Sequence, residues 1–197
     1  MIAGLLLMLS LARAADTGAL YQASYEREAA ADYAGALGQI DALIAAGEDD
    51  YVVHLRRGWL LYLVGRYADS AVEYQAASAK DPGSAEAVAG WTLPLMALRR
   101  WTDAERACRR LLELTPNNYL GLSRLAYVLY SAGRYADAEA QYAAVLRLYP
   151  SDVEMRTGLG WAQLKQGKVP QARAAFTEVL RTAPGHTSSK EGLAAAK

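Results

Sequence analysis

The sequence has little of what most catalytic and metal sites need. Its 197 residues include one cysteine, Cys108, and two histidines, His54 and His186. A single cysteine excludes a disulfide within the chain. The two histidines are far apart and have no cysteine or further histidine at ligand spacing, which argues against a metal site and against a catalytic triad. We therefore expect no enzyme, no cofactor and no metal.

An excess of charge of one sign is also missing. The chain has 21 basic and 21 acidic residues, so neither nucleic acid nor an anionic membrane surface is an expected partner. The charges are unevenly placed, because residues 17–50 hold one basic and seven acidic residues whereas residues 153–186 hold five basic and two acidic. This asymmetry is either ordinary solvated surface or a device for end-to-end association and partner orientation.

No apolar run is long enough to span a bilayer, which takes about 20 residues. The stretch from Ile2 to Leu11 is apolar except for Ser10, and the small-x-small sequence Ala12-Arg13-Ala14 follows it. Such a pattern is typical of a secretory signal peptide. We predict a cleaved signal peptide over residues 1–15 and an exported, periplasmic protein without a membrane span in its mature form. If uncleaved, the segment would serve as a membrane anchor.

What the sequence does have is a period of 34 residues. Four prolines lie 34 residues apart and three glycines keep the same register: Pro82, Pro116, Pro150, Pro184, Gly65, Gly133 and Gly167. Between them, apolar residues follow the i, i+3, i+4, i+7 spacing of one helical face. Each period therefore predicts a helix, a tight glycine turn, a second helix and a proline break.

This pattern resembles the tetratricopeptide repeat family. The resemblance covers residues 17–186 in five units, over 17–50, 51–84, 85–118, 119–152 and 153–186. It implies an all-α, right-handed solenoid of helix-turn-helix repeats. We expect residues 187–197 to form a C-terminal capping helix, with Leu193 facing inward and Ser188, Ser189, Lys190 and Glu191 facing water.

The repeat register separates core positions from capping positions. Positions 8 and 20 of the unit are small in all five repeats, and position 24 is larger, reading Ile40, Tyr74, Cys108, Tyr142 and Phe176. Small residues let two helices approach, and the larger residue fills the space beside them. We therefore place Cys108 in the core. Position 34 supplies four good helix N-caps, namely Asp50, Ser84, Asn118 and Asp152.

The resemblance also implies a groove lined by the first helix of each repeat. Its positions 5, 9 and 12 are rich in aromatic residues, and the predicted partner-binding residues are Tyr21, Tyr25, Trp59, Tyr62, Tyr127, Tyr130 and Trp161. Tyrosine and tryptophan offer a large apolar surface with a polar tip. The alternative is that these rings only pack between repeats. A clamp for acidic peptide tails is disfavoured, because Lys165, at position 13, is the only basic residue among positions 2, 5, 9, 12 and 13, which commonly face the ligand in this family.

Three functions remain open at this point. The first is a non-catalytic scaffold that binds a protein or peptide segment along the aromatic groove. The second is glycan or polysaccharide binding, in which the same rings stack on sugars beside Glu28, Glu86, Asn118 or Glu154, or a role as an export accessory protein. The third is self-assembly through the acidic and basic ends. The sequence leaves the identity of the partner and the oligomeric state undetermined.

Overall fold

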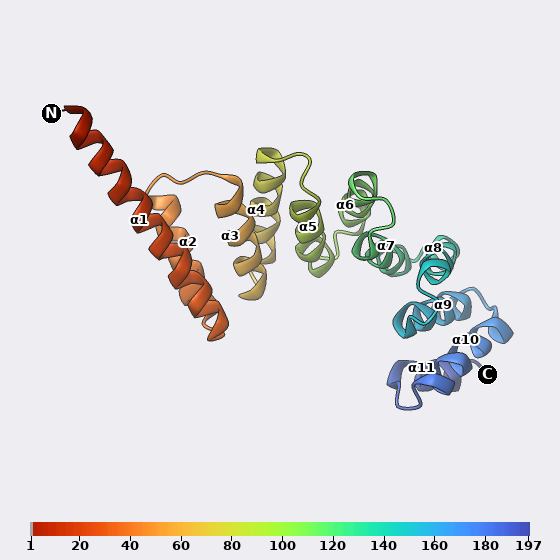
Figure 1. Cartoon of the computed structure of the whole chain (residues 1–197). Helices are drawn as coiled ribbons and strands as arrows, with labels where there is room; N and C mark the ends of the chain where they lie inside the picture. Colours follow the sequence, from red (N-terminus) through yellow and green to blue (C-terminus); the bar gives the residue numbers. More distant parts are fainter. Residues whose placement is uncertain (1) are drawn as a thin grey trace. The chain divides into compact units, whose positions relative to one another are not determined.

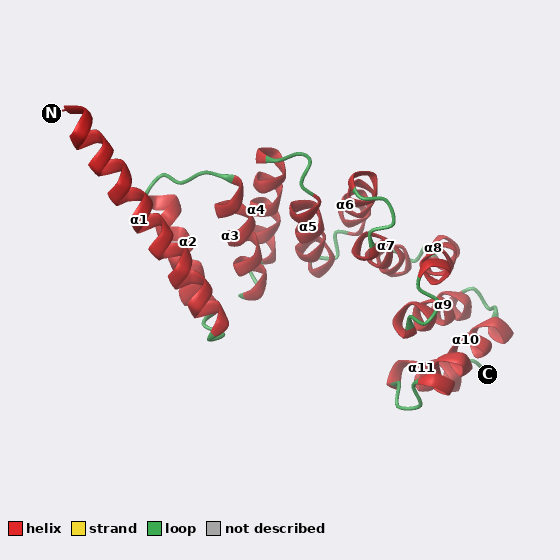
Figure 2. Cartoon of the chain, in the orientation of Figure 1, coloured by secondary structure: helices red, strands yellow, loops and turns green. Residues whose placement is uncertain are grey.

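The protein is all-helical over the part that the computed structural model describes, which is the backbone of residues 2–197 and the side chains of residues 16–197. Eleven helices and no strand occur within it (Figures 1 and 2). This confirms the predicted fold class. The helices are α1 (Ile2–Ala29), α2 (Tyr33–Ala45), α3 (Tyr51–Leu63), α4 (Tyr67–Lys80), α5 (Ala85–Ala97), α6 (Trp101–Leu114), α7 (Tyr119–Ser131), α8 (Tyr135–Leu148), α9 (Val153–Lys165), α10 (Val169–Thr182) and α11 (Thr187–Ala195).

The first helix is twice the length of its neighbours. It starts at Ile2 and ends at Ala29, so its first half coincides with the segment predicted to be a signal peptide. The side chains of residues 1–15 lie outside the described part, and the signal peptide stays a prediction. Among the residues that were described, no helix combines the length and the apolar character that a membrane span requires.

Side-chain caps mark the start of the first helix in the second to fifth repeats. Asp50, Ser84, Asn118 and Asp152 each accept a hydrogen bond, at 2.9–3.0 Å, from the backbone N–H three residues later. This confirms the four predicted N-caps. His186 occupies the same repeat position, and its Nδ1 accepts from the N–H of Ser189 at 3.2 Å. It is a fifth cap that the residue-type preference did not reveal, because histidine is not a favoured capping residue.

The turn inside each repeat uses a left-handed backbone. Gly65, Gly133 and Gly167 have φ between 75° and 80°, a region in which glycine carries no steric cost. Ala31 and Arg99 occupy the same repeat position with φ of 60° and 56°. The turn geometry is therefore imposed by the packing of the two helices even where no glycine is available.

The chain forms two compact units, Met1–Leu98 with helices α1–α5 and Arg99–Lys197 with helices α6–α11. We call them unit 1 and unit 2. In each unit, helices that follow one another in the sequence pack together, as α3 with α4 and α9 with α10 show in Figure 1. Each unit thus contains complete helical hairpins, and each buries its own core.

The two cores follow the small-to-large rule of the repeat. In unit 1 the ring of Tyr74 lies against Gly58 and Gly90, where an added Cβ would fall 3.0 and 2.2 Å from ring carbons. In unit 2 the ring of Phe176 lies against Gly160 and Gly192 in the same way. Glycine is required at these sites because the large side chain of the neighbouring helix takes the space of its missing Cβ.

Cys108 occupies the position equivalent to Tyr74 and Phe176. Its side chain is fully buried within unit 2, which confirms that it is a core residue. Burial raises the pKa of its thiol to about 12, so the thiolate that a nucleophile requires is scarce at neutral pH.

The C-terminal helix differs from its prediction. Ser189, Gly192 and Ala196 are buried and Leu193 is only half-buried. The expectation that Ser189 faces water is wrong, because its hydroxyl bonds to Thr157 at 2.9 Å beneath the helix. Helix α11 packs against α9 and α10, and it presents small and hydroxylated residues to them.

Candidate functional site

The predicted aromatic residues gather at two separate sites, one in each unit. Tyr25 on α1 and Trp59 on α3 line a concave surface of unit 1. Tyr127 on α7 and Trp161 on α9 line one in unit 2, and Tyr130 joins them. In both sites the tyrosine and the tryptophan occupy position 9 of consecutive repeats, so the helical register places the same pair of rings side by side.

The unit 1 site is an open concavity of about 550 Å³. It is lined by Tyr25, Glu28, Ala29, Tyr33, Arg56, Trp59 and Leu63. Tyr25 is the most exposed of its aromatic rings, with 53% of its surface accessible, whereas Trp59 is half-buried. The half-buried Trp59 offers a ligand a fixed apolar surface, and the exposed Tyr25 offers one that can adjust its position.

An ion pair between buried Arg56 and partly exposed Glu28 forms the floor of the unit 1 site. The Glu28 carboxylate accepts from the Trp59 indole N–H at 2.6 Å and from Arg56 Nη1 at 2.9 Å. Arg56 is 7% exposed, its Nε donates to Ser24 Oγ at 3.0 Å, and its guanidinium carbon lies 3.6 Å from the centre of the Tyr25 ring. Charge-assisted bonds and a cation–π contact therefore hold both rings in place.

Two predicted site residues of unit 1 lie outside this concavity. Tyr21 packs against the unit 1 core, and burial, followed by the nearby carboxylate of Asp50, raises the pKa of its hydroxyl to about 12. Tyr62 stacks against Trp59, with ring centres 6.0 Å apart, and also contacts Tyr67. The structure thus gives Tyr62 a supporting contact with Trp59 and gives Tyr21 a packing contact.

The unit 2 site is smaller and more apolar, with a volume of about 250 Å³. Its lining residues are Tyr127, Tyr130, Tyr142, Glu154, Met155, Thr157, Gly158, Trp161 and Ser188. Tyr127 is 47% exposed, as Tyr25 is in unit 1. A volume of this size and lining accommodates one large apolar side chain.

Contacts behind the unit 2 site hold Trp161 in position. Its indole N–H donates to Ser188 Oγ at 2.9 Å, and its ring meets Phe176 edge-on with centres 5.4 Å apart. The buried ring of Tyr142 fills the space beside Gly158, where a Cβ would approach it to 2.5 Å. Burial raises the pKa of Tyr130, so its hydroxyl stays protonated at neutral pH and is available as a hydrogen-bond donor.

The carboxylates and the amide that were candidates for sugar binding are dispersed. Glu28 and Glu154 line the unit 1 and unit 2 sites respectively. Glu86 accepts from the Tyr51 hydroxyl, and Asn118 caps α7. Glu28 is bonded by Arg56 and Trp59 and its side chain is 25% exposed. Glu154 is contacted by His186 Nε2 at 3.1 Å, and its side chain is 73% exposed.

Arg56 and Ser188 are two of the lining residues that sequence reasoning missed. Arg56 occupies position 6, which was not counted among the groove positions, and the neighbouring Arg57 and His54 in the same helix gave no signal that distinguished it. Ser188 was assigned to water, which is wrong, because it accepts from Trp161. Only the packing of α11 against α9 shows that contact. Among the described residues, no group of three or more His, Cys, Asp or Glu side chains is placed to hold a metal ion.

Comparison with known proteins agrees with this architecture. The family model described as "Tetratricopeptide repeat" matches residues 21–85, 95–152 and 123–187, which together make up most of the chain. No curated protein matches the sequence.

Solved structures show the same fold at low sequence identity. The MamA protein has a TM-score of 0.77 and 19% identity over 84% of this chain and 91% of MamA. A repeat protein from Parabacteroides merdae has a TM-score of 0.84 and 16% identity over 92% of this chain and 72% of its own. YrrB, described as having an unusual peptide-binding site, has a TM-score of 0.76 and 14% identity over 87% and 89%.

Proposed function

Because the chain belongs to the tetratricopeptide repeat family, we propose that it is a non-catalytic scaffold that binds an extended segment of a partner protein. The observation that carries the proposal is the unit 2 site, where Tyr127, Tyr130 and Trp161 surround an apolar concavity of about 250 Å³. Anchoring aromatic residues of this kind contribute most of the binding energy in protein interfaces.

A peptide fits the unit 2 site better than a compact ligand does. The site holds one large apolar side chain, and polar groups stand at its border, among them the Tyr130 hydroxyl and the Glu154 carboxylate. An extended chain places one side chain in such a pocket and offers backbone N–H and C=O groups to the border. The unit 1 site, with its ion-paired floor, would receive a more polar residue of the same or another segment.

The proposal is tested by selecting ligands for the full chain from a display library of random linear peptides. We expect Trp161→Ala to raise the Kd of a selected peptide by about 30-fold or more, the loss typical of an interface hot spot. Trp59→Ala with Trp161→Ala is expected to abolish capture while the far-ultraviolet circular dichroism stays helical.

The matched pair Tyr127→Ala and Tyr149→Ala controls for loss of an exposed ring. Tyr127 lines the unit 2 site, and Tyr149 is 38% exposed in the same unit but outside it. Only the first variant should weaken the selected peptide. Equal affinity in the two variants, or a peptide that binds Trp161→Ala normally, would contradict the proposal.

A second candidate function is glycan binding at the unit 2 site. It is favoured by Glu154, a mostly exposed carboxylate beside the Trp161 ring, because sugar sites combine an aromatic face with carboxylates. Titration of the tryptophan fluorescence with envelope oligosaccharides distinguishes the two functions. A saturable change that Glu154→Gln removes would support sugar binding, and an unchanged spectrum would leave the peptide as the ligand.

We also propose that the protein acts in the cell envelope, on the basis of the signal-peptide pattern in residues 1–15. The test is cell fractionation followed by N-terminal sequencing of the recovered protein. A chain that starts at Ala15 or Asp16 in the periplasmic fraction supports the proposal. A chain recovered in the cytosol with residues 1–15 intact contradicts it.

A further inference from the structure

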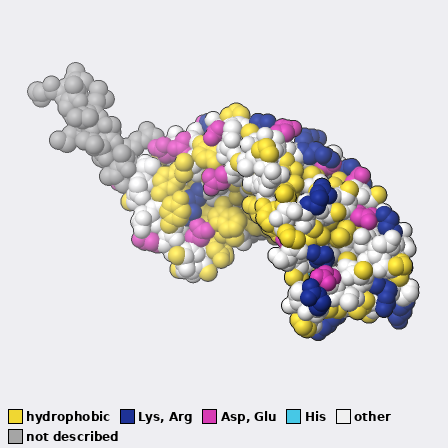
Figure 3. All heavy atoms as spheres, turned by 45° about the vertical axis from the view of Figure 1, so that its right-hand side comes forward, with side chains coloured by type: hydrophobic (Ala, Val, Ile, Leu, Met, Phe, Trp, Pro, Cys, Tyr) yellow, Lys and Arg dark blue, Asp and Glu magenta, His cyan; other side chains and the backbone are white. Residues whose placement is uncertain are grey.

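Charge is segregated between the two units. Residues 1–98 hold six Lys or Arg and twelve Asp or Glu, a net charge of −6, whereas residues 99–197 hold fifteen and nine, a net charge of +6. In the face that Figure 3 shows, the dark-blue Lys and Arg side chains are most numerous toward the C-terminal helices. A neutral chain thus consists of an acidic unit and a basic unit.

The acidity of unit 1 is concentrated at one edge. In each unit, the second helix of one repeat ends and the first helix of the next repeat begins on the same side. We call this side the turn edge. In unit 1 this edge comprises residues 46–50 and 81–84 with the helix starts that follow, and its carboxylates are Glu48, Asp49, Asp50, Asp81 and Glu86. Lys80 and His54 both contact Asp49. Val52 stands among these acids, 45% exposed.

The turn edge of unit 2 carries an apolar patch. Tyr119, Leu120, Leu148 and Tyr149 are 37–49% exposed, and the two tyrosine rings meet edge-on with centres 5.1 Å apart. Four large apolar side chains in one exposed group are unusual unless another surface covers them. The exposed side chain of Arg147 directly precedes the patch in the sequence.

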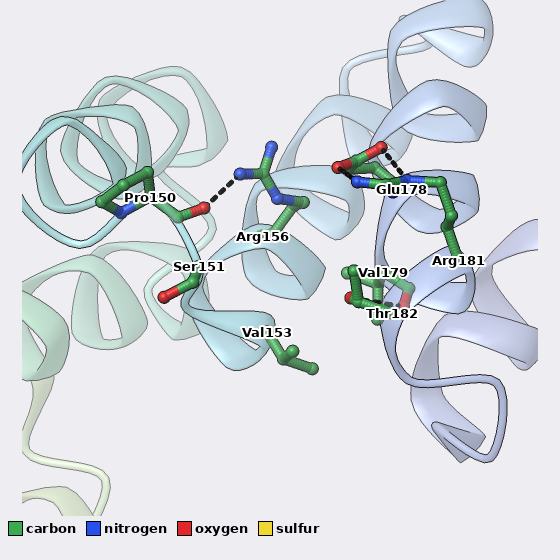
Figure 4. Close-up of a pocket in the computed structure, with 8 residues that line it drawn as sticks. All are labelled: Pro150, Ser151, Val153, Arg156, Glu178, Val179, Arg181 and Thr182. Atoms are coloured by element: carbon green, nitrogen blue, oxygen red, sulfur yellow. Dashed lines mark hydrogen bonds and ion pairs between the residues drawn. The ribbon is translucent and has the colours of Figure 1, made fainter.

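A cleft of about 390 Å³ continues this edge (Figure 4). It is lined by Pro150, Ser151, Val153, Arg156, Glu178, Val179, Arg181 and Thr182. Arg156 donates from Nη2 to the carbonyl of Pro150 at 2.5 Å, and Arg181 pairs with Glu178 along α10. The cleft therefore joins apolar side chains to Arg156, whose guanidinium donates to a backbone carbonyl and lies within electrostatic range of Glu178. Such a surface suits a partner with both apolar and acidic groups.

We propose that the turn edge of unit 2 docks on the turn edge of unit 1 of a second copy of this chain. The turn edge of unit 1 has carboxylates that can pair with the arginines of the cleft. It also has an apolar side chain, Val52, that can pack against the tyrosines of the patch. Contacts between two copies of unit 2, or between two copies of unit 1, are opposed by like charge. The contact joins different surfaces, so it either closes into a dimer with two such contacts or extends into a chain.

Sedimentation velocity of the full chain tests this proposal. We expect the sedimentation coefficient to rise with protein concentration at low salt and to fall toward that of a single chain as salt screens the opposite charges. Arg147→Glu is expected to weaken association roughly tenfold, since it turns an attraction into a repulsion at an exposed site. Arg156→Glu is a second variant at the cleft.

Charge exchange makes the test specific. Glu86→Lys should weaken self-association as Arg147→Glu does, and an equimolar mixture of the two variants should regain it, because each then offers the other a complementary edge. Gln75→Glu, which changes an exposed residue of α4 away from the turn edge, is the control and should retain association.

Three results would overturn the proposal: a single-chain mass at all concentrations and salt levels, association that strengthens with salt, or association that the charge reversals leave unchanged. Trp161→Ala leaves both turn edges intact, so it should lose the selected peptide and keep self-association. Failure of this inference is thereby distinguishable from failure of the proposed peptide binding.

Discussion

The unit 1 and unit 2 sites contain the same pair of aromatic rings, but different residues lie beneath the pair in each site. Tyr25 with Trp59 and Tyr127 with Trp161 occupy equivalent positions of consecutive repeats. Beneath the first pair, Arg56 and Glu28 form an ion pair in which Arg56 is buried and Glu28 is one quarter exposed. The matching positions in unit 2 hold Gly158 and Tyr130.

This difference shows that the 34-residue period determines the position of each ring. The residues that differ between repeats determine which groups the ring contacts. In unit 1 the tryptophan N–H bonds to a carboxylate, and the site is held together by charge. In unit 2 it bonds to a hydroxyl from the C-terminal helix, and Phe176 supports the ring. The two sites are therefore expected to respond differently to loss of packing, loss of charge and added volume.

The largest effect is expected from removing the ring behind the unit 2 site. Phe176 is fully buried, so Phe176→Ala should lower the free energy of unfolding of unit 2 by about 3–5 kcal/mol. Tyr62→Ala, which removes the half-buried ring beside Trp59, should cost unit 1 less. Urea unfolding followed by circular dichroism measures the loss, and hydrogen exchange of peptides assigns it to a unit. An equal loss in both variants would show that the two tryptophans are supported alike.

Loss of the charged floor is expected to affect unit 1 next. Arg56→Met leaves the Glu28 carboxylate without its ion-pair partner and should cost about 2 kcal/mol, less than a fully buried pair because Glu28 is one quarter exposed. The double variant Arg56→Met with Glu28→Gln should recover part of this loss in the same urea titration. Arg156→Met in unit 2, which loses only a bond to a backbone carbonyl, is the matched control. A double variant less stable than the single one would argue against an uncompensated charge.

Adding a methyl group at a glycine should lower stability at a packed position of unit 2 and raise it at an open position of unit 1. Gly158→Ala forces a methyl group against the ring of Tyr142 and is expected to destabilise unit 2 by about 1–2 kcal/mol. Gly38→Ala in α2 of unit 1, where nothing lies within 4 Å of the added carbon, should stabilise by up to about 1 kcal/mol through higher helix propensity. Thermal unfolding of both variants shows the contrast, and a gain in both would mean that Tyr142 moves aside freely.

The smallest effect concerns pH and is confined to unit 1. Burial acts to lower the pKa of His54, but the carboxylates of Asp49 and Glu73, which bond its two ring nitrogens at 2.6 and 2.7 Å, outweigh burial and raise it above 6.5. A raised pKa favours the protonated ring in the folded state. The stabilisation is therefore complete below pH 6.5 and is lost as pH rises through the folded-state pKa.

The variant His54→Gln tests this pH dependence. Below pH 6.5, the free energy of unfolding of His54→Gln should lie furthest below that of the unchanged chain. The difference between the two should shrink as the pH rises. Urea midpoints measured across that range give the comparison. A stability difference that does not vary with pH would mean that His54 contributes packing only.

Much of the fold follows from local features of the sequence. The four N-caps from Asp50 to Asp152, the glycine turns and the placement of Cys108 rest on backbone hydrogen bonds, φ preference and helical period, all of which involve residues within one repeat. The Tyr25–Trp59 and Tyr127–Trp161 pairs follow from the same register, since equivalent positions of adjacent repeats must be neighbours. The binding role of these pairs stays a prediction.

The sequence by itself determined the 34-residue period, the helix starts, the small-to-large packing and the opposite charges of the two halves, because each is a property of composition or of residues close in the chain. Only the tertiary structure decided that Arg56 lies under Tyr25 and bonds to Glu28, and that Ser188 reaches Trp161. These contacts join side chains that are 27–31 residues apart in the sequence and occupy non-equivalent positions of neighbouring repeats. Their geometry depends on the rotation of each helix, which the packing of the whole unit sets and no local preference specifies.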